Sequence, residues 1–506
     1  MKFDRTKNAS RNAFFGAILK IYQLAIPFLM RTVMIYCLGM EYLGLNSLFT
    51  SILQILNLAE LGVGSAMTYS MYKPLADDDK SKIRALMQLY KVYYRIIGLI
   101  VLAIGLVFIP FLPKLIKGSV PEGISIYILY LLNLGATVLS YWLFAYKNSL
   151  LVAHQRTDIT SKITMLMDTI KYLLQISCLV VFKSYYLYLI VALLSQILTN
   201  IVTATVVTRM YPQYKAEGKL ESSEVRVING KVKDLFTSKL GAVIINSADS
   251  VVISAFLGLE MLAIYQNYYF ILTAIIGIVG TVFAACTAGI GNSIITESKE
   301  KNYDDLNKFT FIIVWISGIC SCCLLGLYQP FMELWVGKDN KLGFSAVICF
   351  VIYYFIYEIN QLLNLYKDAA GLWHEDRFRP LITAVSNLIM NLILVQYIGI
   401  YGVLLSTVLT MVGIGMPWLL YNLFTVLFKM KPWSYIRSLA KYVVIVLISV
   451  VISYSIADFI KEVSVFTFIV KGVICTIVPN SIYFIFFRKT EEFRQMIQLG
   501  KKIIKK

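Results

Sequence analysis

Charged residues are scarce in this chain. They make up 15% of its 506 residues, whereas hydrophobic residues make up 58%, and soluble domains carry about 25% charged residues. This shortfall excludes a soluble globular protein and predicts a polytopic membrane protein. The formal net charge is +18, but Lys and Arg lie in short connections between apolar runs. That distribution is typical of loops held at an anionic membrane surface, so we expect no nucleic-acid partner.

Metal-ligand and nucleotide-binding patterns are also lacking. The two histidines, His154 and His374, have no Cys or His neighbours, and the eight cysteines lie in apolar runs without a CxxC spacing, so we expect no metal site. The chain has no GxxxxGK[ST] loop, no nucleotide-binding glycine pattern and no Ser/His/Asp grouping. We therefore expect no cofactor and no enzyme activity. Any transport by the chain would be coupled to a gradient of H⁺ or Na⁺ or to the supply of substrate.

Fourteen apolar runs are each long enough to cross a hydrocarbon core of about 30 Å. They lie at about 13–38, 42–70, 86–112, 124–151, 160–182, 185–208, 236–257, 260–292, 306–328, 342–367, 378–398, 400–428, 438–459 and 465–487. Lys and Arg collect in the connections after even-numbered runs, so the positive-inside rule predicts that both termini are cytoplasmic.

An internal repeat organises these runs. Residues 38–44 (LGMEYLG) recur as 257–263 (LGLEMLA), 219 residues later, and the same offset sets Asp168 against Asn387. A duplication of six helices gives parallel repeats with a functional site between them. The expected all-α architecture is an N-terminal six-helix bundle (1–208), a cytoplasmic linker (209–235), a C-terminal six-helix bundle (236–428), an appended helix pair (429–487) and a basic tail (488–506). The tail fits an amphipathic helix at the inner interface or a frayed basic end.

Arg31 is the clearest candidate for a binding residue. It lies about 25 Å along the first run at 1.5 Å per residue, too deep to reach the cytoplasm, and an ionisable group at that depth costs about 2.5 to 3.5 kcal/mol on insertion scales. The repeat places Asp249 at a similar height in the other half. The two residues form either an ion pair that joins the halves or a cationic subsite with an acidic partner.

Further ionisable residues lie within the apolar runs. Asp168 and Lys171 share a helix face, which favours a local pair or a polar group facing the cavity. Glu358 begins a polar stretch that either faces a water-filled cavity or contributes to helix packing. Glu60 is either a carboxylate at the membrane interface or part of an ion site. We assign these carboxylates and Asp249 to ion coupling or charge balance, and Lys171 to substrate binding.

Three cations lie nearer the predicted cytoplasmic boundary. Lys20, Lys91 and Arg95 are close enough to it for their side chains to snorkel. If they face inward, they make the inner mouth of a cavity cationic and attract phosphate. We include them among the candidate substrate-binding residues.

Short motifs resemble those of a known family. Residues 249–253 (DSVVI), 256–258 (FLG) and 263–265 (AIY) resemble the seventh-helix signature of bacterial polysaccharide flippases, which belong to the multidrug/oligosaccharidyl-lipid/polysaccharide exporter superfamily. Residues 42–45 (YLGL) and 60–62 (ELG) are similar to its first-half pattern, whereas Ala263 stands where a glycine is common.

The resemblance covers essentially the whole chain and implies a function. It implies a flippase of the bacterial cell membrane, surrounded by membrane lipids, that moves an undecaprenyl-diphosphate-linked oligosaccharide to the outer leaflet by alternating access. Arg31 would hold the diphosphate or acidic sugars, and a polysaccharide polymerase would be a partner.

Two other functions stay open. A cation-coupled multidrug exporter of the same superfamily would fit twelve helices better than fourteen. A membrane polymerase or ligase would normally need a large outer loop, and the predicted outer connections are all short.

Overall fold

The computed structural model describes residues 5–60, 62–118 and 120–504. Within these ranges the regular secondary structure is helical and no strand occurs. Eleven of the described helices are long and apolar enough to cross a membrane, or twelve if one bent pair counts as a span. The predicted all-α membrane fold is therefore confirmed, but the count of fourteen spans is not. The chain divides into two compact units, Met1–Ala263 and Ile264–Lys506.

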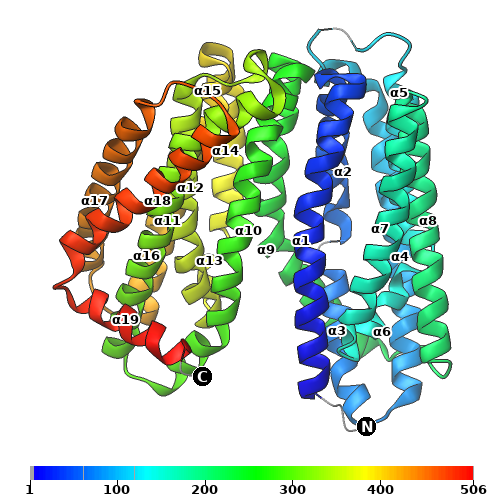
Figure 1. The fold of residues 1–506 in the computed structure, drawn as a ribbon. Coiled ribbons are helices and arrows are strands. Elements are labelled where there is room, and N and C mark those ends of the chain that lie inside the picture. The colour runs from blue at the N-terminus through cyan, green and yellow to red at the C-terminus, as the bar shows by residue number, and fades with distance from the viewer. Residues whose placement is uncertain (1–4, 61, 119, 505–506) are drawn as a thin grey trace. The chain divides into compact units, whose positions relative to one another are not determined.

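Unit 1 (Met1–Ala263) contains the helices coloured from blue to green in Figure 1. They are α1 (Arg5–Leu38), α2 (Met40–Leu56), η1 (Asn57–Glu60), α3 (Val63–Ala76), α4 (Lys80–Phe108), η2 (Ile109–Leu115), α5 (Ile126–Trp142), η3 (Ala145–Lys147), α6 (Asn148–Ala153), α7 (Thr157–Val180), α8 (Tyr185–Met210) and α9 (Ser222–Leu257). Helix α7 packs between α1 and α8, α4 packs on α5, and α9 packs on α2 and α3. Helix α10 (Leu259–Thr296) begins in this unit.

The second predicted span is interrupted in the structure. We expected one helix over 42–70, but α2 ends at Leu56, η1 follows, and α3 starts only at Val63. Gly62 precedes α3 with φ of 90°, a conformation that residues with a Cβ rarely adopt. Hydropathy does not detect such a break, because the residues on both sides of it are apolar.

The two copies of the repeated motif share one backbone conformation. Gly39 separates α1 from α2 with φ 104° and ψ 174°, and Gly258 separates α9 from α10 with φ 96° and ψ 175°. Both values favour glycine strongly. The same helix–glycine–helix junction therefore occurs at the offset of 219 residues, as a duplication would require.

Unit 2 (Ile264–Lys506) contains the rest of α10 and the helices that follow it. These are α11 (Lys299–Val336), η4 (Lys338–Asn340), α12 (Phe344–Ala369), α13 (Trp373–Asp376), α14 (Arg379–Ile398), α15 (Ile400–Thr410), the π-helical turns η5 (Met411–Gly415) and η6 (Leu423–Leu427) on either side of α16 (Met416–Asn422), α17 (Trp433–Asp458), α18 (Val465–Phe487) and α19 (Glu491–Ile504). Helix α11 packs against α12, α17 and α18.

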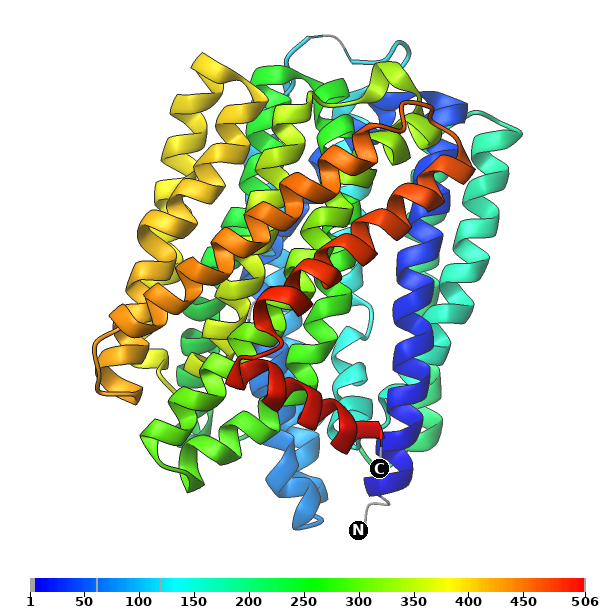
Figure 2. The same cartoon turned by 60° about the vertical axis from the view of Figure 1, so that its left-hand side comes forward.

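The last helices pack closely against α11, as Figure 2 shows. A Cβ on Gly318 would lie 2.1 Å from the Tyr483 hydroxyl, so glycine permits this close approach of α11 and α18. Trp315 stacks edge-on against Tyr483 with ring centroids 5.2 Å apart. Helix α19 packs on α11, and its Phe493 stacks on Trp315 at 5.6 Å. The basic tail is thus helical from Glu491 to Ile504.

Candidate functional site

The predicted cation Arg31 lies in a polar and aromatic cluster inside unit 1. It is partly buried on α1, close enough to the Tyr188 hydroxyl of α8 for an electrostatic interaction, and Tyr188 interacts in turn with Tyr172 of α7. Tyr22 of α1 approaches Tyr172 with ring centroids 6.4 Å apart. We call the residues Tyr22, Arg31, Asp168, Lys171, Tyr172 and Tyr188 the arginine cluster.

Asp168 and Lys171 form the local ion pair that was one of the two predicted alternatives. The Lys171 ammonium lies 2.6 Å from Asp168 Oδ1, with side chains 21% and 23% exposed, and 4.2 Å from the centroid of the Tyr172 ring. Because this pair is neutral, the net charge of the arginine cluster is that of Arg31. Phenol hydroxyls beside a guanidinium can bind the oxygens of an anion.

Glu60 lies where the second span breaks and accepts hydrogen bonds from two tyrosines. Tyr94 donates to Oε1 at 2.6 Å, and the Tyr141 hydroxyl lies 2.9 Å from Oε2. Tyr90 donates to the Tyr94 hydroxyl at 2.9 Å, and Asn57 Oδ1 lies 3.0 Å from the Tyr141 hydroxyl. These five residues form the Glu60 cluster. Two charge-assisted hydrogen bonds stabilise its carboxylate away from bulk water.

Asp249 is buried on α9, with 9% of its surface exposed. Two residues earlier, the Ser247 hydroxyl donates to Gln54 Oε1 of α2 at 3.2 Å. Asp249 therefore belongs to the helix that packs on α2 in unit 1. Its predicted pairing with Arg31 stays a prediction, as does a site between two halves.

Glu358 is the most deeply buried of the predicted carboxylates. It lies on α12 in unit 2 with 1% exposure, and neither side-chain oxygen has a hydrogen-bond partner. Its nearest ionisable neighbours include Cys320 of α11 and Tyr354 of its own helix. A carboxyl group in such surroundings must be protonated or must hold a cation, because an isolated buried charge is too costly.

The remaining predicted cations do not join the arginine cluster by any described contact. Lys20 and Arg95 are exposed and Lys91 is half-buried. Arg95 interacts electrostatically with Tyr146, and Lys91 with Lys147, so the structure places both near the bend that follows α5.

Two charged clusters were missed by sequence reasoning. In unit 1, Asp158 is fully buried and lies 3.0 Å from Arg156, 3.8 Å from Arg11 and 3.8 Å from Lys162. In unit 2, Asp376 is 2% exposed and lies 2.6 Å from the Arg379 Nε and 3.5 Å from the Lys367 ammonium. Asp158 stands four residues after His154 and Asp376 two residues after His374, each with a cation three or four residues further along the chain. That spacing is the signal that could have revealed them.

The tyrosines of the candidate clusters were also missed, since hydropathy counts tyrosine among the residues of an apolar run. Their buried hydroxyls, however, need polar partners. Within the described residues no group of three or more Cys, His, Asp or Glu could hold a metal ion.

Comparison with known proteins places the chain in a family. The model of the family described as "polysaccharide biosynthesis protein" matches residues 9–287, more than half of the chain. The chain belongs to this family. No curated protein sequence matches it.

Solved structures show that this family member has the fold of known flippases and transporters. The lipid II flippase MurJ in its inward closed conformation superposes with a TM-score of 0.70 at 19% identity, covering 94% of this chain and 99% of MurJ. An inward-facing multidrug resistance MATE transporter of the MOP superfamily gives 0.63 at 15% identity, covering 80% and 97%. The Vibrio cholerae MATE transporter VcmN in its bent form gives 0.51 at 16% identity, covering 86% and 99%. The resemblance seen in the sequence is thus confirmed at the level of family and fold.

Proposed function

We propose that this protein is a flippase of the bacterial cytoplasmic membrane. It moves undecaprenyl-diphosphate-linked oligosaccharide repeat units from the cytoplasmic to the outer leaflet by alternating access, with both termini in the cytoplasm and with H⁺ or Na⁺ as the coupling ion. The observation that carries the proposal is the arginine cluster, a net positive site inside the helical bundle of a polysaccharide biosynthesis protein.

The cargo explains why such a cluster is useful. A diphosphate has several anionic oxygens, and Arg31 supplies the fixed guanidinium that suits phosphate recognition. Lys171 is held by Asp168 at 2.6 Å, and in this proposal it turns to the diphosphate when cargo arrives. Asp249 balances Arg31 when the site is empty. Lys20, Lys91 and Arg95 attract the cargo at the inner mouth.

Three carboxylates are proposed for ion coupling. Glu358 is the strongest of them, because its two oxygens are buried and unpartnered, so that H⁺ or Na⁺ would complete it. Glu60 lies at a break in a span, where backbone groups left outside the helix can add ligands. Asp168 would be released when Lys171 binds cargo. Unchanged pH and Na⁺ dependence of transport in a Glu358→Gln variant would contradict the role of Glu358.

The test of the function is deletion of the gene in its native host. We expect loss of the surface polysaccharide and accumulation of lipid-linked repeat units on the cytoplasmic side. Complementation with Arg31→Lys should restore part of the polymer and Arg31→Ala none, at matched protein level. The control variant Lys80→Ala, which lacks an exposed cation of α4, should restore the full amount of polymer. Full export by the Arg31→Ala variant would contradict the role of the arginine cluster.

A cation-coupled multidrug exporter is the second candidate, since the fold is also that of MATE transporters. In that case deletion would leave the polysaccharide unchanged and overproduction would raise resistance to cationic drugs. The sites dominated by Asp249 and Glu358 would then bind the drug.

A further inference from the structure

A pocket in unit 1 lies where the fourth predicted span bends. Helix α5 ends at Trp142, and the segment Ala145–Ala153 continues at an angle of 48° to it. Phe144, between the two, has φ of 60°, a left-handed conformation that costs a residue with a Cβ roughly 1–2 kcal/mol. Strain of this kind often marks a functional position. Here the bend opens a pocket of about 370 Å³ against the last turns of α8.

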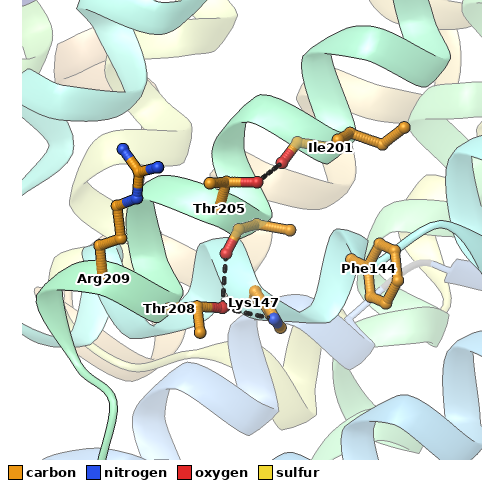
Figure 3. Close-up of a pocket in the computed structure, with 7 residues that line it drawn as sticks. Phe144, Lys147, Ile201, Thr205, Thr208 and Arg209 are labelled. Carbon is orange, nitrogen blue, oxygen red and sulfur yellow. Dashed lines mark hydrogen bonds between the residues drawn. The ribbon is translucent and has the colours of Figure 1, made fainter.

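The pocket combines two cations and two hydroxyls with apolar walls (Figure 3). Lys147 donates to the Thr208 hydroxyl at 2.6 Å, and Arg209 lies on the adjoining wall. Thr205 and Thr208 donate their hydroxyl hydrogens to backbone carbonyls of their own helix, so the positive charge of the pocket comes from Lys147 and Arg209 and the threonine oxygens act as acceptors. Phe144 and Ile201 form the apolar side.

The cations of this region lack acidic partners. Lys147 is close enough to Lys91 for mutual repulsion, and Arg95 lies nearby beside Tyr146. Within the described residues, none of Lys91, Arg95, Lys147 and Arg209 lies within ion-pair distance of a carboxylate. Like charges gathered at one place are stabilised by an anion.

Exposed apolar residues beside the pocket indicate which kind of molecule supplies this anionic group. Leu194, Leu198 and Ile201 are 51%, 50% and 42% exposed, and their spacing of four and three residues sets them in one stripe along α8 that leads to the pocket. An acyl chain can lie along such a stripe. The pocket is at the end of α8 that the positive residues predict to be cytoplasmic, where anionic lipids are concentrated.

We propose that this pocket binds an anionic phospholipid of the inner leaflet. The headgroup phosphate lies between Lys147 and Arg209, and one acyl chain follows the stripe on α8. A phospholipid and a free phosphate both offer a phosphate group to these cations. Only the phospholipid also has an acyl chain that can contact the apolar stripe on α8. This site is separate from the arginine cluster and does not depend on the proposed cargo.

The test measures binding of a fluorescent phosphatidylglycerol to the purified full chain in nonionic detergent. Unlabelled phosphatidylglycerol should displace the probe, and phosphatidylcholine should do so at least about tenfold more weakly because its choline would face two cations. Glycerol phosphate should not compete at a large excess. Displacement by glycerol phosphate as effective as that by the lipid would show a free-anion site and overturn the proposal.

Variants test the location. Lys147→Gln and Arg209→Gln should each weaken binding about tenfold, as the loss of one charge-assisted bond does. The control pair Lys215→Gln and Lys219→Gln removes two exposed cations from the connection after α8 and should change affinity by less than about twofold. An equal loss of lipid affinity in the control variants would show that binding depends only on general charge attraction, and it would refute the proposed site.

One further variant keeps all charges. Ile201→Trp fills the pocket with an apolar side chain and should weaken lipid binding about tenfold while leaving the net charge unchanged. Its melting temperature verifies folding independently of the Lys and Arg variants. Undiminished lipid binding by a folded Ile201→Trp protein would contradict the proposal. Because the assay measures lipid binding and not polysaccharide export, its result is independent of the proposed flippase function.

Discussion

Replacing Glu358 by methionine should stabilise the protein. The side chain is 1% exposed and both of its oxygens lack hydrogen-bond partners. An unsatisfied buried polar group costs about 1–3 kcal/mol, and methionine has a similar length and fills irregular gaps in a core. A swap of similar volume usually costs less than about 1.5 kcal/mol. The balance is a gain of about 1 kcal/mol.

This gain is large enough to measure by thermal unfolding. For a unit of the size of unit 2, 1 kcal/mol corresponds to about 2–4 °C, so we expect a rise of about 2–4 °C. The assay follows tryptophan fluorescence during heating in nonionic detergent, in a buffer free of Na⁺. Glu333→Gln is the matched control on α11. Its carboxylate lies 2.5 Å from the Lys341 ammonium, so this variant should lower the melting temperature or leave it unchanged.

A lower melting temperature of the Glu358→Met variant would refute this reasoning. Removal of one partner from a buried ion pair costs about 3–5 kcal/mol. A fall of that size in the absence of Na⁺ would mean that the Glu358 carboxylate has a protein partner in solution. Stabilisation of the wild type by Na⁺, absent from the Glu358→Met variant, would instead support the proposed coupling role, since a bound ion stabilises the folded state by mass action.

Three further predictions concern unit 1. A Cβ on Gly44 would lie 2.0 Å from the Leu259 carbonyl oxygen, so Gly44→Ala should destabilise by about 3 kcal/mol in thermal unfolding, whereas Gly135→Ala, with open space around it, should not. Glu60→Ala removes the acceptor of two tyrosine hydroxyls and should cost about 2–4 kcal/mol in the same assay, with Gln costing about half; an unchanged melting temperature would rule out a stabilising Glu60 cluster. Burial lowers the pKa of His154 below its usual 6.5, against the effect of its backbone hydrogen bond, so its unfolded form binds protons more readily. Its contribution to stability is complete above about pH 6.5 and is lost as the pH falls through the folded pKa, and a His154→Phe variant should unfold with a flatter pH profile between about pH 5 and 7.

Much of the fold could be predicted because it follows from long apolar runs and one repeated motif. The junctions at Gly39 and Gly258 share a backbone conformation, as their equal sequence context indicates. The break after Leu56 and the bend after Trp142 were not predictable. Both depend on a single residue in a left-handed conformation, Gly62 and Phe144, and hydropathy carries no information on backbone angles.

In the arginine cluster and the Glu60 cluster, the sequence singled out the charged residues and missed the tyrosines, and it missed the charged groups around Asp158 and Asp376 altogether. Lys171 does pair with Asp168, because a separation of three residues on a helix fixes the contact. The tyrosines around Glu60 come from α4 and α5, far away in the sequence. No local pattern predicts which of the many tyrosines meet one carboxylate, because that depends on how the helices rotate against each other.

The buried aspartates Asp158 and Asp376 bear on how the two halves of such a protein can diverge. They stand one residue short of the repeat offset of 219, so a strict superposition of the halves sets Asp158 against Arg377 rather than Asp376. Each aspartate nevertheless lies close to cations and stands two or four residues after a histidine. After a gene duplication, selection can keep a buried aspartate with its surrounding cations although the exact sequence position shifts by a residue. An alignment of the two halves by identical residues at equivalent positions then underestimates their similarity, whereas a comparison of their buried charges detects it.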